Sequence, residues 1–105
     1  MGYMRYHTMV VIGWDHADTV VAHEAAVQIF GESSVSNIVT SAIINRYESF
    51  FIPPDGGPEG LEESNKGDKN RAIFKDWLKG SKHHFRWVEV CFADEGGDAR
   101  IEEES

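Results

Sequence analysis

The sequence predicts a single α+β domain with four strands and two helices. Its 105 residues leave room for one hydrophobic core but not for two. The hydrophobic share of 41% and the charged share of 27% are ordinary for a globular protein. Apolar runs typical of strands are interleaved with two stretches in which apolar residues recur at helical spacing. This alternation indicates the α+β class.

The N-terminal part is expected to form a strand followed by a helix. Residues 6–14 are rich in β-branched and aromatic side chains and are apolar on both alternating faces, as in a central strand. Asp15 is placed to cap a helix over residues 17–30. Gly31 is placed to end that helix.

Two further strands and a long loop follow. Residues 36–45 contain a β-branched run, and residues 48–53 contain two adjacent phenylalanines and an isoleucine. Residues 53–67 include three prolines and four glycines, which sustain neither a helix nor a strand ladder. We expect a loop there that acts as a lid or contacts a partner.

The C-terminal part is expected to form a helix, a strand and a tail. Asp68 is placed to cap the helix and Gly80 to end it. Residues 84–93 form the last strand, so the domain covers residues 1–93, and the acidic residues 94–105 are expected to be a flexible tail. The expected buried stripe of the helix is Ile73, Phe74, Trp77 and Leu78.

The resulting order is β-α-β-β-α-β, the order of ferredoxin-like domains. Such a domain has a four-stranded antiparallel sheet with two helices on one face and the first and third strands at its centre. Neither face of the strand over residues 6–14 is polar, so the sheet face without helices would expose apolar side chains. A homo-oligomer that covers this face is therefore expected.

The charge distribution narrows the class of partner. The net charge is −8, but residues 66–86 hold seven cations and two acids, a local charge of +5, so the rest of the chain carries −13. This acidity argues against duplex nucleic acid as a partner. No apolar run approaches the roughly 20 residues needed to span a bilayer. With one cysteine, Cys91, and no signal peptide pattern, a cytoplasmic protein is expected.

No catalytic site, metal site or cofactor is expected from sequence spacing. His16 and His23 lie about 10 Å apart along their helix, too far to share a metal ion, and His7 has no second ligand at a fixed spacing. Cys91 lies in an apolar strand, where a thiol is usually part of the core. An acid–base site remains open as an alternative, with carboxylates from Glu24, Glu48 and Glu89.

The best candidates for ligand binding are three cations and two aromatic side chains. Arg71, Lys75 and Lys79 are spaced by four and are expected to line the helix face opposite its apolar stripe. An anionic partner would relieve their repulsion, and so would acids of the chain itself, such as Asp76 and the tail. Trp14 and Tyr47 lie near strand ends and could stack on a ligand.

Three segments resemble small accessory proteins of tailed bacteriophages: RYHTMVVIGWD at 5–15, YESFFIPPDG at 47–56 and FRWVEV at 85–90. The resemblance spans most of the chain but includes no diagnostic motif. It implies a protein of the host cytoplasm that acts against host defence by sequestering a signalling nucleotide or by capping a host protein.

The leading hypothesis is therefore a non-catalytic protein that binds a small anionic, nucleotide-like ligand. The first alternative is an inhibitor that turns an acidic surface, with Glu62, Glu63, Asp94 and Glu95, towards a basic host protein. The second alternative is a small acid–base enzyme.

Overall fold

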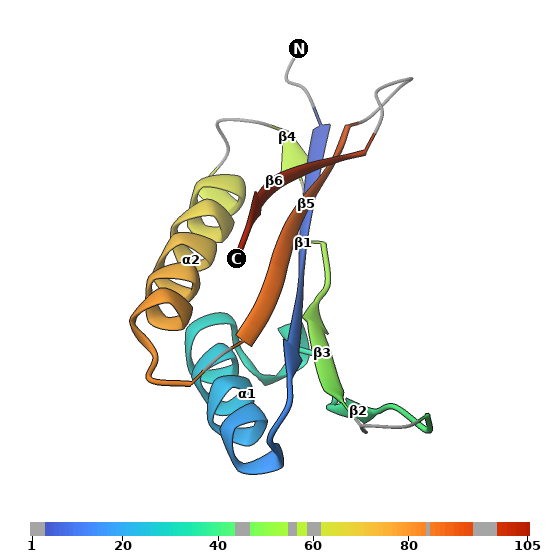
Figure 1. The fold of residues 1–105 in the computed structure, drawn as a ribbon. Coiled ribbons are helices and arrows are strands. Elements are labelled where there is room, and N and C mark those ends of the chain that lie inside the picture. The colour runs from blue at the N-terminus through green and yellow to red at the C-terminus, as the bar shows by residue number, and fades with distance from the viewer. Residues whose placement is uncertain (1–3, 44–46, 55–56, 59–61, 84, 94–98) are drawn as a thin grey trace.

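The protein is an α+β domain in which two helices pack against one face of an antiparallel sheet (Figure 1). The computed structural model describes residues 4–43, 47–54, 57–58, 62–83, 85–93 and 99–105. The helices within these ranges are α1 (His16–Phe30), the short 3-10 helix η1 (Glu32–Ser34) and α2 (Glu62–Gly80). The strands are β1 (Met4–Gly13), β2 (Val39–Thr40), β3 (Glu48–Ile52), β4 (Gly57–Pro58), β5 (Phe85–Ala93) and β6 (Arg100–Glu104).

The long strand β1 is the centre of the sheet. Five strands follow the order β2-β3-β1-β5-β6, and every described pairing is antiparallel. β5 pairs with nearly the whole of β1, from Arg5 opposite Ala93 to Gly13 opposite Phe85. β3 pairs only with the C-terminal half of β1, starting where Met9 lies opposite Ile52. The apolar strand predicted over residues 6–14 is thus the central strand.

The expectation of four strands is wrong, because β4 and β6 extend the sheet. β3 leaves the N-terminal half of β1 without a partner on that side, and Gly57–Pro58 pairs there with Met4 and Arg5. β5 would otherwise form an edge with open backbone groups, and β6 pairs with it. Residues 100–104 are therefore part of the sheet and not of a loose tail, while residues 94–98 lie outside the described residues. The expected strand over residues 36–45 is reduced to Val39–Thr40.

Both ends of α1 and the C-terminal end of α2 lie where the sequence predicts them, but the start of α2 does not. The side chain of Asp15 accepts a hydrogen bond from the Asp18 N–H, and Gly31 ends α1 at a positive φ of 97°, so both predicted caps are confirmed. The helix α2 ends at Gly80 as expected, but it begins at Glu62 and not after Asp68.

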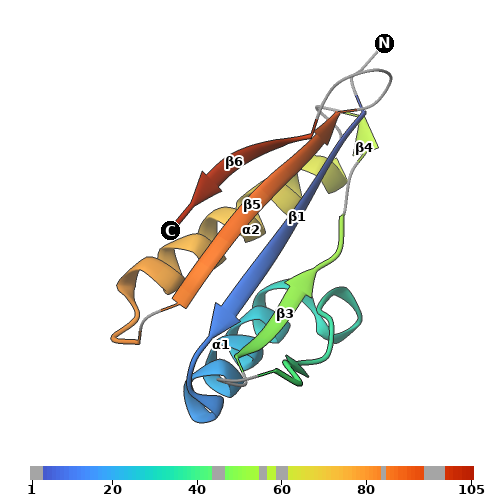
Figure 2. The same ribbon diagram turned by 45° about the vertical axis from the view of Figure 1, so that its right-hand side comes forward.

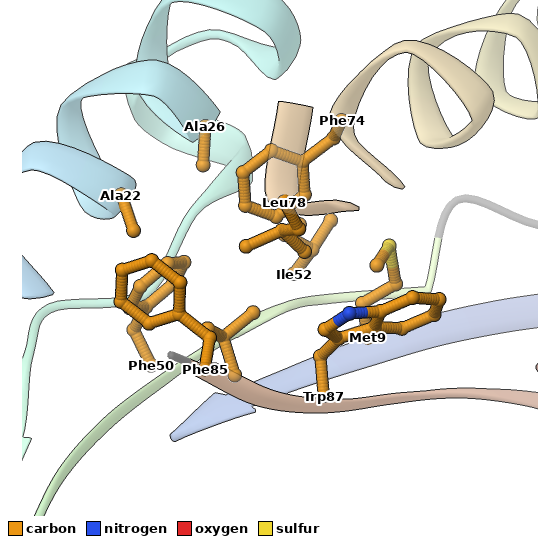
Figure 3. Packing of buried hydrophobic residues seen from close by; sticks show 10 residues of the cluster. Met9, Ala22, Ala26, Phe50, Ile52, Phe74, Leu78, Phe85 and Trp87 are labelled. Carbon is orange, nitrogen blue, oxygen red and sulfur yellow. The ribbon is translucent and has the colours of Figure 1, made fainter. Parts of the chain in front are cut away.

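The core lies between the helices and the sheet. In Figure 3 the side chains of Phe50, Ile52, Phe85 and Trp87 point from the sheet towards the helices. Figure 2 shows α1 behind the β1–β3 side of the sheet and α2 behind the β5–β6 side.

The expected buried stripe of α2 is only partly correct. Phe74 and Leu78 are buried and Trp77 is partly buried, with its ring stacked on Phe74 at a centroid distance of 6.2 Å. Ile73, by contrast, is 45% exposed. Arg71 is buried in its place, so α2 is rotated relative to the orientation that its apolar residues predict.

The sheet face opposite the helices carries apolar side chains, and no described helix or strand covers it (Figure 1). Alternation along β1 places Val10 and Ile12 there, and Phe51 of β3 lies opposite Val10. Phe51 and Phe92 are each more than 40% exposed. This surface, called the open face below, matches the expectation of apolar residues on both sides of the sheet.

The rotation of α2 predicts different effects for two neighbouring residues. Phe74→Ala should lower the free energy of unfolding by about 3–5 kcal/mol, because it removes a fully buried ring. Ile73→Ala should lower it by less than about 1 kcal/mol, because that side chain is half exposed. Urea denaturation of both variants measures the difference. Equal losses would mean that α2 presents another face to the sheet.

Candidate functional site

A buried carboxylate, Glu89, is the centre of a charged cluster between the sheet and α2. Its oxygen Oε2 lies 3.1 Å from Nδ1 of His7 and 3.2 Å from Nε of Arg71. Its oxygen Oε1 accepts a hydrogen bond of 2.7 Å from Nζ of Lys75. The Glu89 side chain is 6% exposed and that of Arg71 is 4% exposed. These four residues are called the Glu89 cluster.

Strand alternation and helix periodicity bring these side chains together. Glu89 lies between the buried residues Trp87 and Cys91 on β5, so its side chain must face the helices. His7 is opposite Cys91 in the neighbouring strand and shares that face. Arg71 and Lys75 are four residues apart on α2 and reach Glu89 from above the sheet.

The ion pairs continue from the Glu89 cluster to the edge strand β6. Lys75 also lies 2.9 Å from Glu103, and Lys79 lies 2.6 Å from the other oxygen of that carboxylate. At the opposite end, Arg71 pairs with Asp68 one turn earlier in the helix. Each cation of the predicted ladder is therefore bound to an acid of the chain.

This arrangement corrects the predicted orientation of Arg71, Lys75 and Lys79. The ladder was expected opposite the apolar stripe, but it faces β5 and β6. The alternative in which the chain's own acids neutralise the ladder fits the structure. Those acids are Glu89 and, from the expected tail, Glu103.

The contacts with β6 shift the pKa values of Lys75 and Glu103 in the directions that favour their charged forms. Burial alone lowers the pKa of Lys75, but its hydrogen bonds to Glu89 and Glu103 outweigh that effect and hold the pKa above its ordinary value. Hydrogen bonds from Lys79 and Lys75 hold the pKa of Glu103 below its ordinary value. Both shifts favour the charged forms, so the bridge from α2 to β6 persists across neutral pH.

The predicted aromatic residues form a second site on the open face. Gly13 lies opposite Glu48 in the β1–β3 register, so Trp14 after it and Tyr47 before Glu48 meet across the two strands. Their rings contact edge to face with a centroid distance of 5.7 Å. They border a hollow of about 350 Å³, whose other lining residues are Val10, Ile12, Arg86, Trp87, Val88 and Glu104. This site is called the aromatic hollow.

The five predicted ligand-binding residues thus divide between two sites. Trp14 and Tyr47 border the aromatic hollow on the open face, whereas the ladder of α2 lies on the helix side of the sheet. Sequence reasoning missed Arg86, the cation of the hollow. Arg86 precedes Trp87 in β5, and successive side chains of a strand point to opposite faces. Since Trp87 faces the helices, Arg86 must lie on the open face.

A second hollow of about 350 Å³ lies near the start of α2. It is lined by Pro53 and Pro54 of the expected loop, by Lys66, Gly67 and Asn70 of α2, and by Phe30, Ser33, Ser34 and Ile52. The central part of that loop, residues 55–56 and 59–61, lies outside the described residues. The proposed lid therefore remains a prediction.

The three carboxylates considered for acid–base chemistry do not form one site. Glu48 is buried and accepts a hydrogen bond of 2.7 Å from Nδ1 of the exposed His16. It lies opposite Gly13, whereas Glu89 lies opposite Met9, a separation of roughly 13 Å along β1. Glu24 is exposed on α1. Each buried carboxylate instead has its own histidine partner.

The remaining described histidines contact oxygen atoms of the chain itself. Another histidine, His7, belongs to a cluster of side chains that could ligate a metal ion. His23 contacts the Ser36 carbonyl oxygen at 2.8 Å, and His83 lies 3.0 Å from Asp18. His7, Cys91 and Glu102 form the one cluster of three metal-ligating side chains found among the described residues.

No protein-family model matches the chain, and neither the curated proteins nor the solved structures include a significant match. None of the described helices is long and apolar enough to cross a membrane. The functional assignment therefore depends on the two sites themselves.

The bridge between α2 and β6 predicts a specific pH dependence. Because the pKa of Glu103 is lowered by folding, its stabilising effect is complete above the ordinary glutamate pKa of about 4.3 and is lost as the pH falls through the lower folded value. Glu103→Gln should therefore reduce stability at neutral pH by less than about 1 kcal/mol. The difference from wild type should disappear in acid.

Urea denaturation from pH 7 to pH 3 tests this expectation. Glu104→Gln is the matched control. Glu104 is the next residue after Glu103, but its carboxylate borders the aromatic hollow and not α2. A Glu103→Gln variant that differs equally from wild type at both pH values would contradict the assigned role of the bridge.

Proposed function

We propose that this chain is a non-catalytic binding protein that holds a small anionic, nucleotide-like ligand against the open face of its sheet. The observation that carries the proposal is the aromatic hollow. Its paired rings, Trp14 and Tyr47, are 47% and 41% exposed and meet edge to face, so a planar group can stack on one of them while the other borders it. Arg86 supplies a guanidinium for an anionic group at the same hollow.

Arg86 takes the place of the α2 ladder as the source of positive charge. The ladder's cations are engaged with Glu89 and Glu103, so an external anion would have to displace internal carboxylates. Glu104 also borders the hollow and would repel an anion. Arg86 should therefore strengthen the binding of an anion and Glu104 should weaken it, and both effects on affinity can be measured.

The proposed origin of the ligand comes from the resemblance to phage accessory proteins. On that basis we propose a nucleotide signal of host defence, sequestered in the host cytoplasm. The inhibitor that uses an acidic surface stays a prediction, and two of its residues, Asp94 and Glu95, lie outside the described residues.

The proposal includes a topology and an oligomer. We infer a ferredoxin-like core of β1, β2, β3 and β5, with β4 and β6 as additions, because these four strands follow the order β2-β3-β1-β5. We also propose a homodimer through the open face. The apolar side chains of Phe51, Phe92 and Ile101, the last opposite Val90, support it.

Ligand binding can be tested with adenosine monophosphate as a probe and tryptophan fluorescence as the readout. Trp14→Ala should weaken binding roughly 5- to 100-fold, the loss expected for one base stacked on an aromatic ring. Arg86→Gln should also weaken binding, whereas Glu104→Gln should strengthen it. Calorimetry replaces fluorescence for the Trp14 variant.

Matched controls separate the hollow from other surfaces. Lys82→Gln removes an exposed cation beyond α2, away from the open face, and should leave binding unchanged. If Arg71→Ala and Lys75→Ala abolish binding in a folded protein while Arg86→Gln does not, the ladder is the binding site and the assignment to the hollow is wrong.

The dimer is tested by analytical ultracentrifugation at micromolar concentration. The wild-type chain should sediment as a dimer, and Phe51→Glu should convert it to a monomer, because a charge would be buried in an apolar interface. Ile73→Glu is the matched control, since Ile73 is 45% exposed and Phe51 46%, but Ile73 lies on α2. A monomeric wild type would contradict the proposed cover of the open face.

A further inference from the structure

We propose that His7, Cys91 and Glu102 form a binding site for a divalent transition metal ion of the zinc class. One imidazole nitrogen, the Cys91 Sγ and a Glu102 carboxylate oxygen lie within 4.8 Å of one another. The three residues come from the neighbouring strands β1, β5 and β6. No cluster of this kind is visible in the sequence, because each ligand comes from a different strand.

The sheet register holds the three ligands in one row. His7 and Cys91 are direct partners between β1 and β5. On β6, Glu103 lies opposite Glu89 and Ile101 opposite Val90, so Glu102 is the extra residue of a bulge. A bulge redirects a side chain, and here it turns the Glu102 carboxylate towards Cys91.

The ligand set matches the chemistry of zinc and not that of calcium or magnesium. Imidazole, thiolate and carboxylate are all zinc ligands, whereas the harder cations take oxygen ligands. Tetrahedral ligands at zinc bond lengths stand about 3.3–3.8 Å apart. The present separations do not exceed 4.8 Å, so reaching these values needs only a small movement of Glu102, whose side chain is exposed. Three protein ligands leave the fourth position for water or another small ligand.

A second, independent observation is the contact that orients His7. Its Nδ1 lies 3.1 Å from Glu89, and an ionised carboxylate only accepts hydrogen bonds. A neutral His7 therefore donates from Nδ1, which leaves the lone pair of Nε2 for a metal ion. A carboxylate behind a histidine ligand is a recurrent feature of metal sites, where it fixes the ring and its tautomer.

The surrounding charges are compatible with a bound dication. Arg71 and Lys75 would repel it if they were unpaired, but Glu89 and Glu103 compensate them. Arg100 lies 3.4 Å from the Glu102 carboxylate, and a metal ion would have to compete with this exposed ion pair. The Cys91 thiolate and the Glu102 carboxylate would then balance the two charges of the metal ion. Of the three ligands, Cys91 is 2% exposed, His7 is partly buried and Glu102 is exposed to solvent.

Cobalt titration of the full chain, purified in chelator and then desalted, tests the site. One equivalent of Co²⁺ should give a thiolate-to-cobalt charge-transfer band with the strong visible absorption of tetrahedral cobalt, and Zn²⁺ should abolish both. Cys91→Ser should remove the charge-transfer band. Glu102→Gln, a change to an exposed side chain, should lower Co²⁺ affinity at least about tenfold without unfolding the protein.

Two controls make the result specific. Glu104→Gln changes a carboxylate two residues away and should leave the spectrum and affinity unchanged. His83→Gln changes an exposed histidine that is paired with Asp18, outside the cluster, and should also leave the spectrum and the Co²⁺ affinity unchanged. Absence of a charge-transfer band in the folded wild type, or a band that persists unchanged in Glu102→Gln, overturns the proposal. No nucleotide is used, so this outcome is independent of the proposed function.

Discussion

The structure depends on one constraint: the buried Glu89 carboxylate must be paired. A carboxylate that is 6% exposed is unfavourable unless cations or hydrogen-bond donors surround it. Arg71 and Lys75 supply the charge, and their positions fix the rotation of α2 about its axis, which turns Ile73 towards solvent. The apolar pattern of the helix alone favours another rotation. The ion pairs therefore select the helix face that packs on the sheet.

The same cluster explains why the C-terminal residues join the sheet. Lys75 has donors left after it contacts Glu89, and Glu103 accepts from it and from Lys79. The backbone of β6 meanwhile satisfies the open edge of β5. An acidic segment that sequence reasoning treats as a tail is thus bound by two kinds of interaction. Its acidity serves the fold, because the basic face of α2 requires carboxylates at that edge.

Signals within short segments predicted where most helices and strands lie. Pairing between distant segments determined how long each one is and which of its faces is buried. Asp15 and Gly31 mark the ends of α1 because capping involves only neighbouring backbone groups. Trp14 and Tyr47 were identified separately, but only the β1–β3 register brings their rings into contact. β4, β6 and the partners of Glu89 depend on segments far apart in the chain. Periodicity within a single segment carries no information about them.

Residues of two different kinds of site alternate along the sequence of β5, and the sheet places them on opposite faces. Along β5, alternate residues belong to opposite faces, so Glu89 and Cys91 lie with the helices while Arg86 faces the aromatic hollow. The helix side holds fixed charges and soft ligands, which suit a small cation. The open side offers exposed rings and the guanidinium of Arg86, which suit a planar anion. No residue of the Glu89 cluster lines the aromatic hollow, although Trp87 contacts both sides, so ligand binding on one face leaves the cluster's own ion pairs in place.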